Sequence, residues 1–163
     1  MSEVALFDPI TIKSKVFRNR IVLSPMCQYK AVDGLVSDWH FQHYSRFAFS
    51  GLGAAFIEAT GVSPEGRIGH GCTGIWSDEH IQGLSKIVKV FKEYNCVSGI
   101  QLAHAGRKAS FLRPWDGASP ITKEDTDEPA WQTIGPSAIP INDSSPTPKE
   151  MTIEDIEKVK SDF

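Results

Sequence analysis

The hydrophobic and polar positions of this chain predict three buried strands separated by two amphipathic helices. The short apolar runs at residues 21–24, 54–59 and 97–102 are typical of buried strands. Between them, residues 38–50 and 78–94 have apolar side chains at helical spacing, as at Ile81, Leu84 and Phe91. The alternation of strand and helix predicts a parallel sheet with right-handed crossovers.

The end of the first predicted strand is set by Ser24-Pro25. A residue before proline is held in extended geometry, and proline cannot donate a hydrogen bond to a sheet. Met26, Cys27 and Tyr29 are therefore expected on the loop just past the carboxyl end of the strand. In α/β folds, ligands bind at that end.

The flanking segments have weaker patterns. Residues 5–13 predict two short extended pieces around Asp8-Pro9, arranged as a small hairpin. Residues 62–76 predict a loop, and residues 103–150 a much longer one that contains seven of the ten prolines. A capping-box-like start at Thr152 predicts a last helix that is still running at Phe163.

The length decides how much of a fold this pattern can fill. Both a doubly wound sheet and a (β/α)8 barrel fit the alternation, but a complete barrel needs about 250 residues. The chain has 163 residues, which is enough for about three of the eight units. We therefore expect it to be a fragment, or a truncated product, of something longer.

Composition and charge exclude several classes of function. With a net charge of -3 and a pI of about 5.9, the chain lacks the basic surface that nucleic-acid binding requires. It contains no apolar stretch long enough to cross a membrane, and its start does not resemble a secretory signal. The 3 cysteines show no metal-ligand spacing, which indicates reduced thiols and a cytoplasmic location.

Two places carry candidate chemistry, and both are open to a structural reading. Cys27 is either a small buried hydrophobe, the usual role of cysteine, or a thiol that tunes a cofactor. The run from Gln101 to Lys108 places an amide, an imidazole and a guanidinium at the end of the third strand. These groups either satisfy nearby backbone and carboxylates or bind a planar, electron-rich ligand.

Other motifs point away from further sites. Gly51-Leu52-Gly53 precedes a strand and is followed by Phe56, so it fails as a dinucleotide-binding loop. His40 and His43 share a helix face, but no carboxylate lies near them in the sequence at ligand spacing, which disfavours a metal site.

Taken together in order and spacing, several short motifs resemble the old yellow enzyme family of flavin-dependent ene-reductases, closest to its bacterial-type, xenobiotic-reductase branch. The similarity spans the whole chain. The motifs are Leu6-Phe7-Asp8-Pro9-Ile10, Arg18-Asn19-Arg20-Ile21, Ser24-Pro25-Met26-Cys27-Gln28-Tyr29, Asp33-Gly34, His43-Tyr44, Glu58-Ala59-Thr60, Pro64-Glu65-Gly66-Arg67, Gly74-Ile75-Trp76-Ser77-Asp78, the run from Gly99 to Lys108, and Pro136-Ser137-Ala138.

The resemblance implies a (β/α)8 TIM barrel in which residues 1–163 form the N-terminal part of a single FMN-binding domain. It implies reduction of FMN by NADPH or NADH, followed by hydride transfer from flavin N5 to an activated C=C bond, as in an enone. It also implies roles for individual residues: the flavin would be contacted by Ser24, Pro25, Met26, Cys27, the backbone of Ala59 and the amide of Gln101, and the substrate by Tyr29.

The resemblance also implies what lies outside this chain. The donors that polarise the substrate, the proton donor and the phosphate site belong to later barrel units, so no catalytic residue and no metal site are expected within residues 1–163. The expected partner is a small-molecule alkene, and a homo-oligomer is left open. Two alternatives are a truncated, inactive fragment that acts only through a partner, and a flavoenzyme like the dienoyl-CoA reductases, which share a similar His-x-Gly-Arg stretch.

Overall fold

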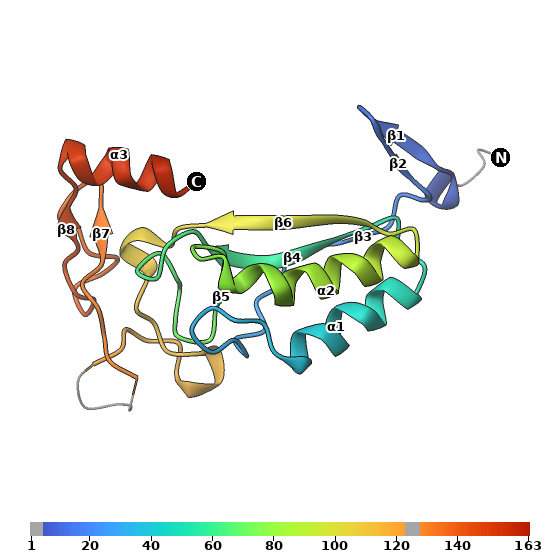
Figure 1. Cartoon of the computed structure of the whole chain (residues 1–163). Helices are drawn as coiled ribbons and strands as arrows, with labels where there is room; N and C mark the ends of the chain where they lie inside the picture. The colour runs from blue at the N-terminus through green and yellow to red at the C-terminus, as the bar shows by residue number, and fades with distance from the viewer. Residues whose placement is uncertain (1–4, 123–127) are drawn as a thin grey trace.

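The centre of the molecule is a small parallel sheet built around one long strand. The structure, a computed structural model, describes residues 5–122 and 128–163. The central strand is β4 (Ala54–Gly61), which pairs in parallel with β3 (Val22–Leu23), β5 (Thr73–Gly74) and β6 (Val97–Ala103) (Figure 1). All three strands predicted from the sequence are present. β5 lies inside a predicted loop, and its two residues are too few to show the alternation of apolar and polar side chains by which a strand is recognised.

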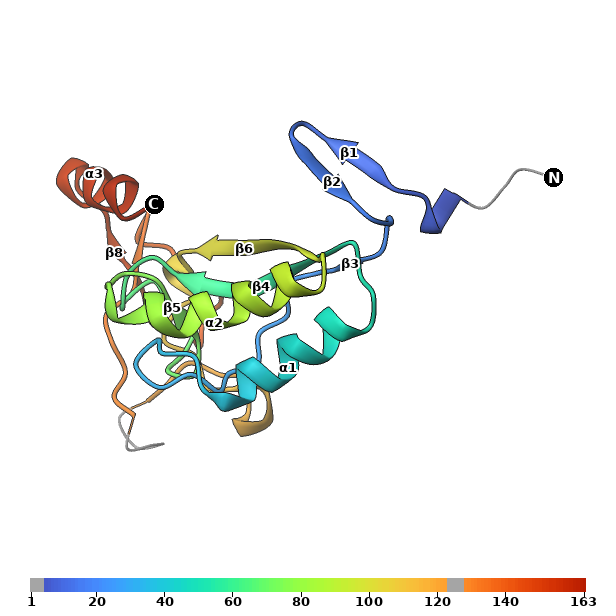
Figure 2. The same cartoon turned by 45° about the vertical axis from the view of Figure 1, so that its right-hand side comes forward.

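Two helices, α1 (Asp38–Phe49) and α2 (Glu79–Glu93), lie side by side on one face of the sheet (Figures 1 and 2). Both start in the same way: the N–H groups of Ser37 and Ser77 donate to Nδ1 of the histidine three residues later, at 3.0 and 3.2 Å. These bonds fix the first turn of each helix, where backbone groups lack helical partners.

The hydrophobic core lies between the helices and the sheet. It is formed by side chains with little or no exposure, from β3, β4, both helices and the turn before β6: Leu23, Tyr44, Ala48, Ala55, Ile57, Leu84, Ile87, Phe91 and Cys96. The apolar stripe predicted for residues 78–94 supplies three of them. The opposite face of the sheet carries Phe56, whose ring lies where a side chain at Gly99 would be.

The N-terminal segment differs from the prediction. A hairpin is present, with β1 (Ile10–Ile12) antiparallel to β2 (Lys15–Phe17), but residues Ala5–Phe7 form a short 3-10 helix. The turn lies at Lys13, which has a left-handed φ of 52°, and not at Asp8-Pro9. Pro9 precedes the first strand, a position where its missing N–H costs no sheet bond.

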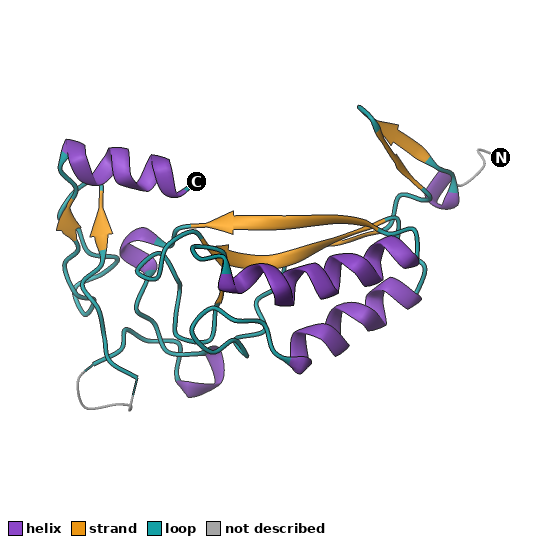
Figure 3. Cartoon of the chain, in the orientation of Figure 1, coloured by secondary structure: helices purple, strands orange, loops and turns teal. Residues whose placement is uncertain are grey.

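The long predicted loop contains several short elements. These are the 3-10 helices η2 (Gly106–Lys108) and η3 (Pro114–Asp116), and the parallel pair β7 (Ile134–Gly135) and β8 (Lys149–Glu150). Residues 123–127 of that loop lie outside the described residues. The last helix, α3 (Ile153–Asp162), follows the second strand of this pair (Figure 3). It begins as predicted at Thr152, whose hydroxyl accepts from the Asp155 amide at 3.2 Å. Within the described ranges, no helix is long and apolar enough to cross a membrane.

Candidate functional site

The carboxyl ends of β3, β4 and β6 meet at one edge of the sheet because the strands are parallel. At this edge Ala59 of β4 is the register partner of Gln101 of β6. The register shifts between Ile57 and Ala59, so Glu58 is an extra residue in β4. Such a bulge turns the following residues, and Ala59 therefore shares a sheet face with Gln101.

Cys27 lies next to this pair. Its thiol is half-buried, and the neighbouring Ala59 backbone and Tyr29 side chain both act to lower its pKa. Burial, with smaller contributions from the nearby Cys72 and Glu58, raises the pKa of the Cys27 thiol to about 11. The thiol is thus protonated at neutral pH and is a weak donor.

The side chain of Gln101 is exposed and has no hydrogen-bond partner among the described residues. The structure therefore brings Cys27, Ala59 and Gln101 to one edge of the sheet. Of the remaining predicted flavin contacts, Pro25 is half-buried, while Ser24 and Met26 are exposed on the segment between β3 and Cys27.

The other polar groups of the Gln101–Lys108 run do not join this edge as donors. Arg107 donates to the carbonyl of Ile139 at 3.2 Å, and Nδ1 of His104 accepts from the amide of Gly106 at 3.1 Å. Burial lowers the pKa of His104, which favours the neutral ring. In the described structure the amide of Gln101 is exposed without a partner, whereas the imidazole and the guanidinium each use at least one nitrogen within the loops and Nε2 of His104 is buried without a partner.

Tyr29 is held by a second loop. Its carbonyl accepts from Nε of Arg113 at 3.4 Å, and Arg113 also forms a two-point pair with Glu128 at 2.7 and 2.8 Å. The ring of Trp115, which is 57% exposed, meets the Tyr29 ring edge-on at a centroid distance of 6.0 Å. Tyr29 thus stands beside an open aromatic surface.

A buried carboxylate behind this edge is a feature that the sequence analysis missed. Glu58 is fully buried, and its Oε2 accepts from the backbone amide of Gln28 at 2.6 Å. The Tyr44 hydroxyl donates to Oε1 of Glu58 at 3.3 Å and accepts from the Glu58 amide at 2.8 Å. A glutamate inside an otherwise apolar strand was the signal that could have identified it, since an unpaired carboxylate is almost never fully buried.

His40 completes this buried cluster. Its Nε2 lies 3.4 Å from Oε1 of Glu58, a carboxylate that is distant in the sequence but close in the fold. The Ser37 N–H donates to Nδ1, which leaves the proton of a neutral ring on Nε2, facing Glu58. Burial raises the pKa of Glu58 to about 7 and lowers that of His40 to about 4.

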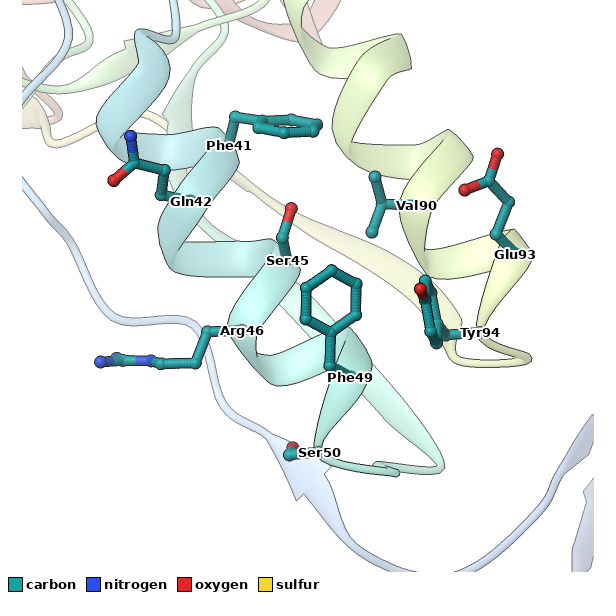
Figure 4. A pocket seen from close by; sticks show the side chains of 9 residues that line it. All are labelled: Phe41, Gln42, Ser45, Arg46, Phe49, Ser50, Val90, Glu93 and Tyr94. Carbon is teal, nitrogen blue, oxygen red and sulfur yellow. The ribbon is translucent and has the colours of Figure 1, made fainter.

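No group of three His, Cys, Asp or Glu side chains in the described part of the chain is placed to hold a metal ion. A groove of about 760 Å³ lies between α1 and α2, lined by Phe41, Phe49 and Tyr94 among others (Figure 4). It lies at the carboxyl ends of the helices and shares no lining residue with the strand-tip edge.

The loop that carries Tyr29 depends on a glycine in the loop before β5. A Cβ added at Gly71 would overlap the carbonyl group of Tyr29. We expect Gly71→Ala to lower the free energy of unfolding by about 1–3 kcal/mol, the usual cost of overpacking against backbone. Urea unfolding measures the change. Gly135→Ala, where the nearest atom would be 3.4 Å away, is the matched control, and equal losses for both variants would contradict the expectation.

Comparison with known proteins gives a consistent picture. The model of the NADH:flavin oxidoreductase / NADH oxidase family matches residues 5–163. An NADPH dehydrogenase of Geobacillus thermodenitrificans is 46% identical over 160 residues, which are 97% of this chain and 42% of that protein. An NADH:flavin oxidoreductase of Gibberella zeae is 40% identical over 159 residues, covering 97% of this chain and 38% of that protein.

Among solved structures, the old yellow enzyme of Pichia sp. AKU4542 superposes with a TM-score of 0.80 at 24% identity, covering 99% of this chain and 41% of that one. This likeness confirms the predicted fold class: the described sheet and helices correspond to the first βα units of a TIM barrel. The chain spans about two fifths of the length of these relatives.

Proposed function

The chain belongs to the NADH:flavin oxidoreductase / NADH oxidase family, and on that premise we propose that residues 1–163 form the N-terminal part of a single FMN-binding barrel domain with flavin-dependent oxidoreductase activity. The chemistry that bound FMN would supply is hydride transfer, first from NADPH or NADH to the flavin and then from N5 to an activated C=C bond of a small molecule. The observation that carries the proposal is the meeting of Cys27, Ala59 and Gln101 at one edge of the sheet.

The donor set at this edge fits a flavin ring. A flat heterocycle with acceptor atoms along its pyrimidine end needs fixed donors in one plane, and the free carboxamide of Gln101 and the backbone of Ala59 are register partners. Ser24, Pro25 and Met26 would provide the adjoining backbone wall. Tyr29, beside the exposed ring of Trp115, would contact the substrate.

Each side chain has a distinct proposed task. Gln101 would bind and orient the pyrimidine end of the ring, and its donor would favour the negative charge that gathers there on reduction. Cys27, kept protonated by burial, would donate weakly near the ring and adjust that preference by a small amount. No charged side chain is needed at this edge for either task.

The task proposed for Cys27 predicts a modest change in reduction potential. In a completed barrel, made by joining residues 1–163 to the C-terminal remainder of the Geobacillus NADPH dehydrogenase, we expect Cys27→Ala to lower the flavin potential by about 10–30 mV. A neutral hydrogen bond is worth about 0.5–1.5 kcal/mol, and about 30 mV corresponds to 1.4 kcal/mol for two electrons. Spectroelectrochemistry measures the shift. Loss of FMN, or an unchanged potential, would contradict the assigned task.

The same completed barrel tests the function itself. We expect it to be yellow and to oxidise NADPH or NADH faster when an enone such as cyclohexenone is added. A yellow barrel that reduces no enone would refute the proposed substrate class. A folded but colourless barrel that takes up no FMN would refute the flavin site and favour the alternative of an inert fragment. The intact Geobacillus enzyme is the control.

A further inference from the structure

The loop of residues 26–29, which carries Cys27 and Tyr29, has few contacts of its own that would hold it in place. It follows a strand of only two residues, and Tyr29 has a left-handed φ of 53°. Left-handed backbone is unfavourable by about 1–2 kcal/mol for a residue with a side chain. Something outside the loop must therefore hold this conformation.

Two partly exposed side chains reach the loop from outside it: Trp39 donates to the Gln28 side chain at 3.2 Å, and Arg113 donates to the Tyr29 carbonyl at 3.4 Å. A third group, Glu58, is fully buried. Gln28 is the residue between Cys27 and Tyr29. The Glu58 carboxylate accepts a hydrogen bond of 2.6 Å from the backbone amide of Gln28. This is among the shortest hydrogen bonds of the chain and joins residues 30 positions apart. Above pH 7, where Glu58 is ionised, this bond has a charged acceptor and is stronger than a bond between neutral groups.

Glu58 is itself fixed on the far side. Tyr44, fully buried on α1, both donates to Oε1 of Glu58 and accepts from the Glu58 amide. The bulge in β4 is what directs this side chain toward the helices and the loop, while the next residue, Ala59, returns to the face of Gln101. The same bulge thus places Glu58 against the loop of residues 26–29 and Ala59 beside Gln101.

We propose that Glu58 is a positioning residue: clamped by Tyr44, its carboxylate holds the loop of residues 26–29 and so fixes the thiol of Cys27 against the tip of β4. This proposal rests on the proposed function only for the reason why the position of the Cys27 thiol matters. The effect of Glu58 on the position of Cys27 does not depend on a bound cofactor.

The test is the alkylation of each cysteine by iodoacetamide, measured peptide by peptide on the full 163-residue chain without flavin. Because Glu58 also raises the pKa of the Cys27 thiol, the rates are measured across pH and expressed per thiolate. In Glu58→Gln we expect this thiolate rate of Cys27 to rise on the order of tenfold, since losing a hydrogen bond to a buried charged group shifts a local equilibrium by about that factor or more. Cys96, buried in the core beyond α2, should keep its rate. A merely structural role for Glu58 would speed all three cysteines together.

Two further variants keep the test decisive. Tyr44→Phe keeps the core aromatic ring but removes the hydroxyl that holds Glu58. It should therefore also raise the alkylation rate of Cys27, by a smaller factor than Glu58→Gln. Glu93→Gln, on the exposed end of α2, should change nothing. The proposal is overturned if Cys27 keeps its rate in both Glu58→Gln and Tyr44→Phe, or if Cys96 accelerates in step with it.

An added arm separates this proposal from the flavin proposal. In the completed barrel, which adds the phosphate site expected from later units, bound FMN should slow the alkylation of Cys27 if the flavin site is correct. Absence of that protection, together with faster alkylation of Cys27 alone in Glu58→Gln, would support the positioning role and refute the flavin site. Protection by FMN with no effect of the Glu58 and Tyr44 variants would refute the positioning role alone.

Discussion

Replacing Phe91 by alanine is expected to lower the free energy of unfolding by about 3–5 kcal/mol, the usual cost of emptying a large buried aromatic site. Phe91 has 0% exposure and lies on the inner side of α2. Its ring meets that of Tyr44 on α1 edge-on at 6.0 Å, so the cavity would open between the two helices and the sheet. Tyr44 in turn holds Glu58, which links this core to the site edge.

Urea unfolding followed by circular dichroism measures the loss. Phe7→Ala is the control, since Phe7 is 70% exposed and its truncation should change stability by less than about 0.5 kcal/mol. A loss of less than about 1 kcal/mol for Phe91→Ala would mean that α1 and α2 do not pack on the sheet as described, because even favourable large-to-small core changes cost more.

Replacing His40 is expected to make stability fall steeply with rising pH. In the folded chain, burial raises the pKa of Glu58 from 4.5 to about 7 and lowers that of His40 from 6.5 to about 4. The contribution of Glu58 to the free energy of unfolding is fully present below pH 4.5 and is lost as pH rises through 7. The contribution of His40 is full above pH 6.5 and is lost as pH falls through 4. Between pH 4.5 and 6.5 the two slopes, each about 1.4 kcal/mol per pH unit, oppose one another.

Single substitutions remove this cancellation in opposite directions. Relative to the unaltered chain, His40→Asn should lose about 1.4 kcal/mol per unit as pH rises from 4.5 to 6.5, or about 3 kcal/mol in total. Glu58→Gln should gain stability over the same range by the same slope. The other groups that face the pair, Tyr44, Cys27 and Cys72, have pKa values above this pH window. His43 is present in the unaltered chain and in both variants, so its own titration cancels in the comparison. The free energy of unfolding is measured by urea for the unaltered chain and both variants between pH 4.5 and 6.5. Equal slopes against pH for the three proteins would contradict the account.

Much of the fold follows from local patterns in the sequence. Apolar runs ending at Pro25, Ala59 and Leu102 gave the three main strands, and helical spacing gave α1 and α2 to within a residue or two. The segments that escaped prediction, such as β5, β7 and β8, have two residues each and are held by distant partners. A pattern of period two cannot be recognised in so short a strand.

The candidate site was predictable in part. Cys27, Ala59 and Gln101 could be placed together because the ends of parallel strands share one edge. The clamp formed by Glu58, Tyr44 and His40 could not, because it depends on a bulge that turns one side chain of β4 toward the helices. Likewise, His104 and Arg107 appeared available in the sequence, but Nδ1 of His104 accepts from the Gly106 amide and Arg107 donates to the Ile139 carbonyl within the loops.

The most direct test of the central claim is a titration of the isotope-labelled completed barrel, freed of flavin, with FMN, followed by NMR. The account predicts that the backbone amides of Cys27 and Ala59 and the side-chain amide of Gln101 shift together on one binding curve. Shifts confined to another surface, such as the groove between α1 and α2, or no shifts at all, would contradict it.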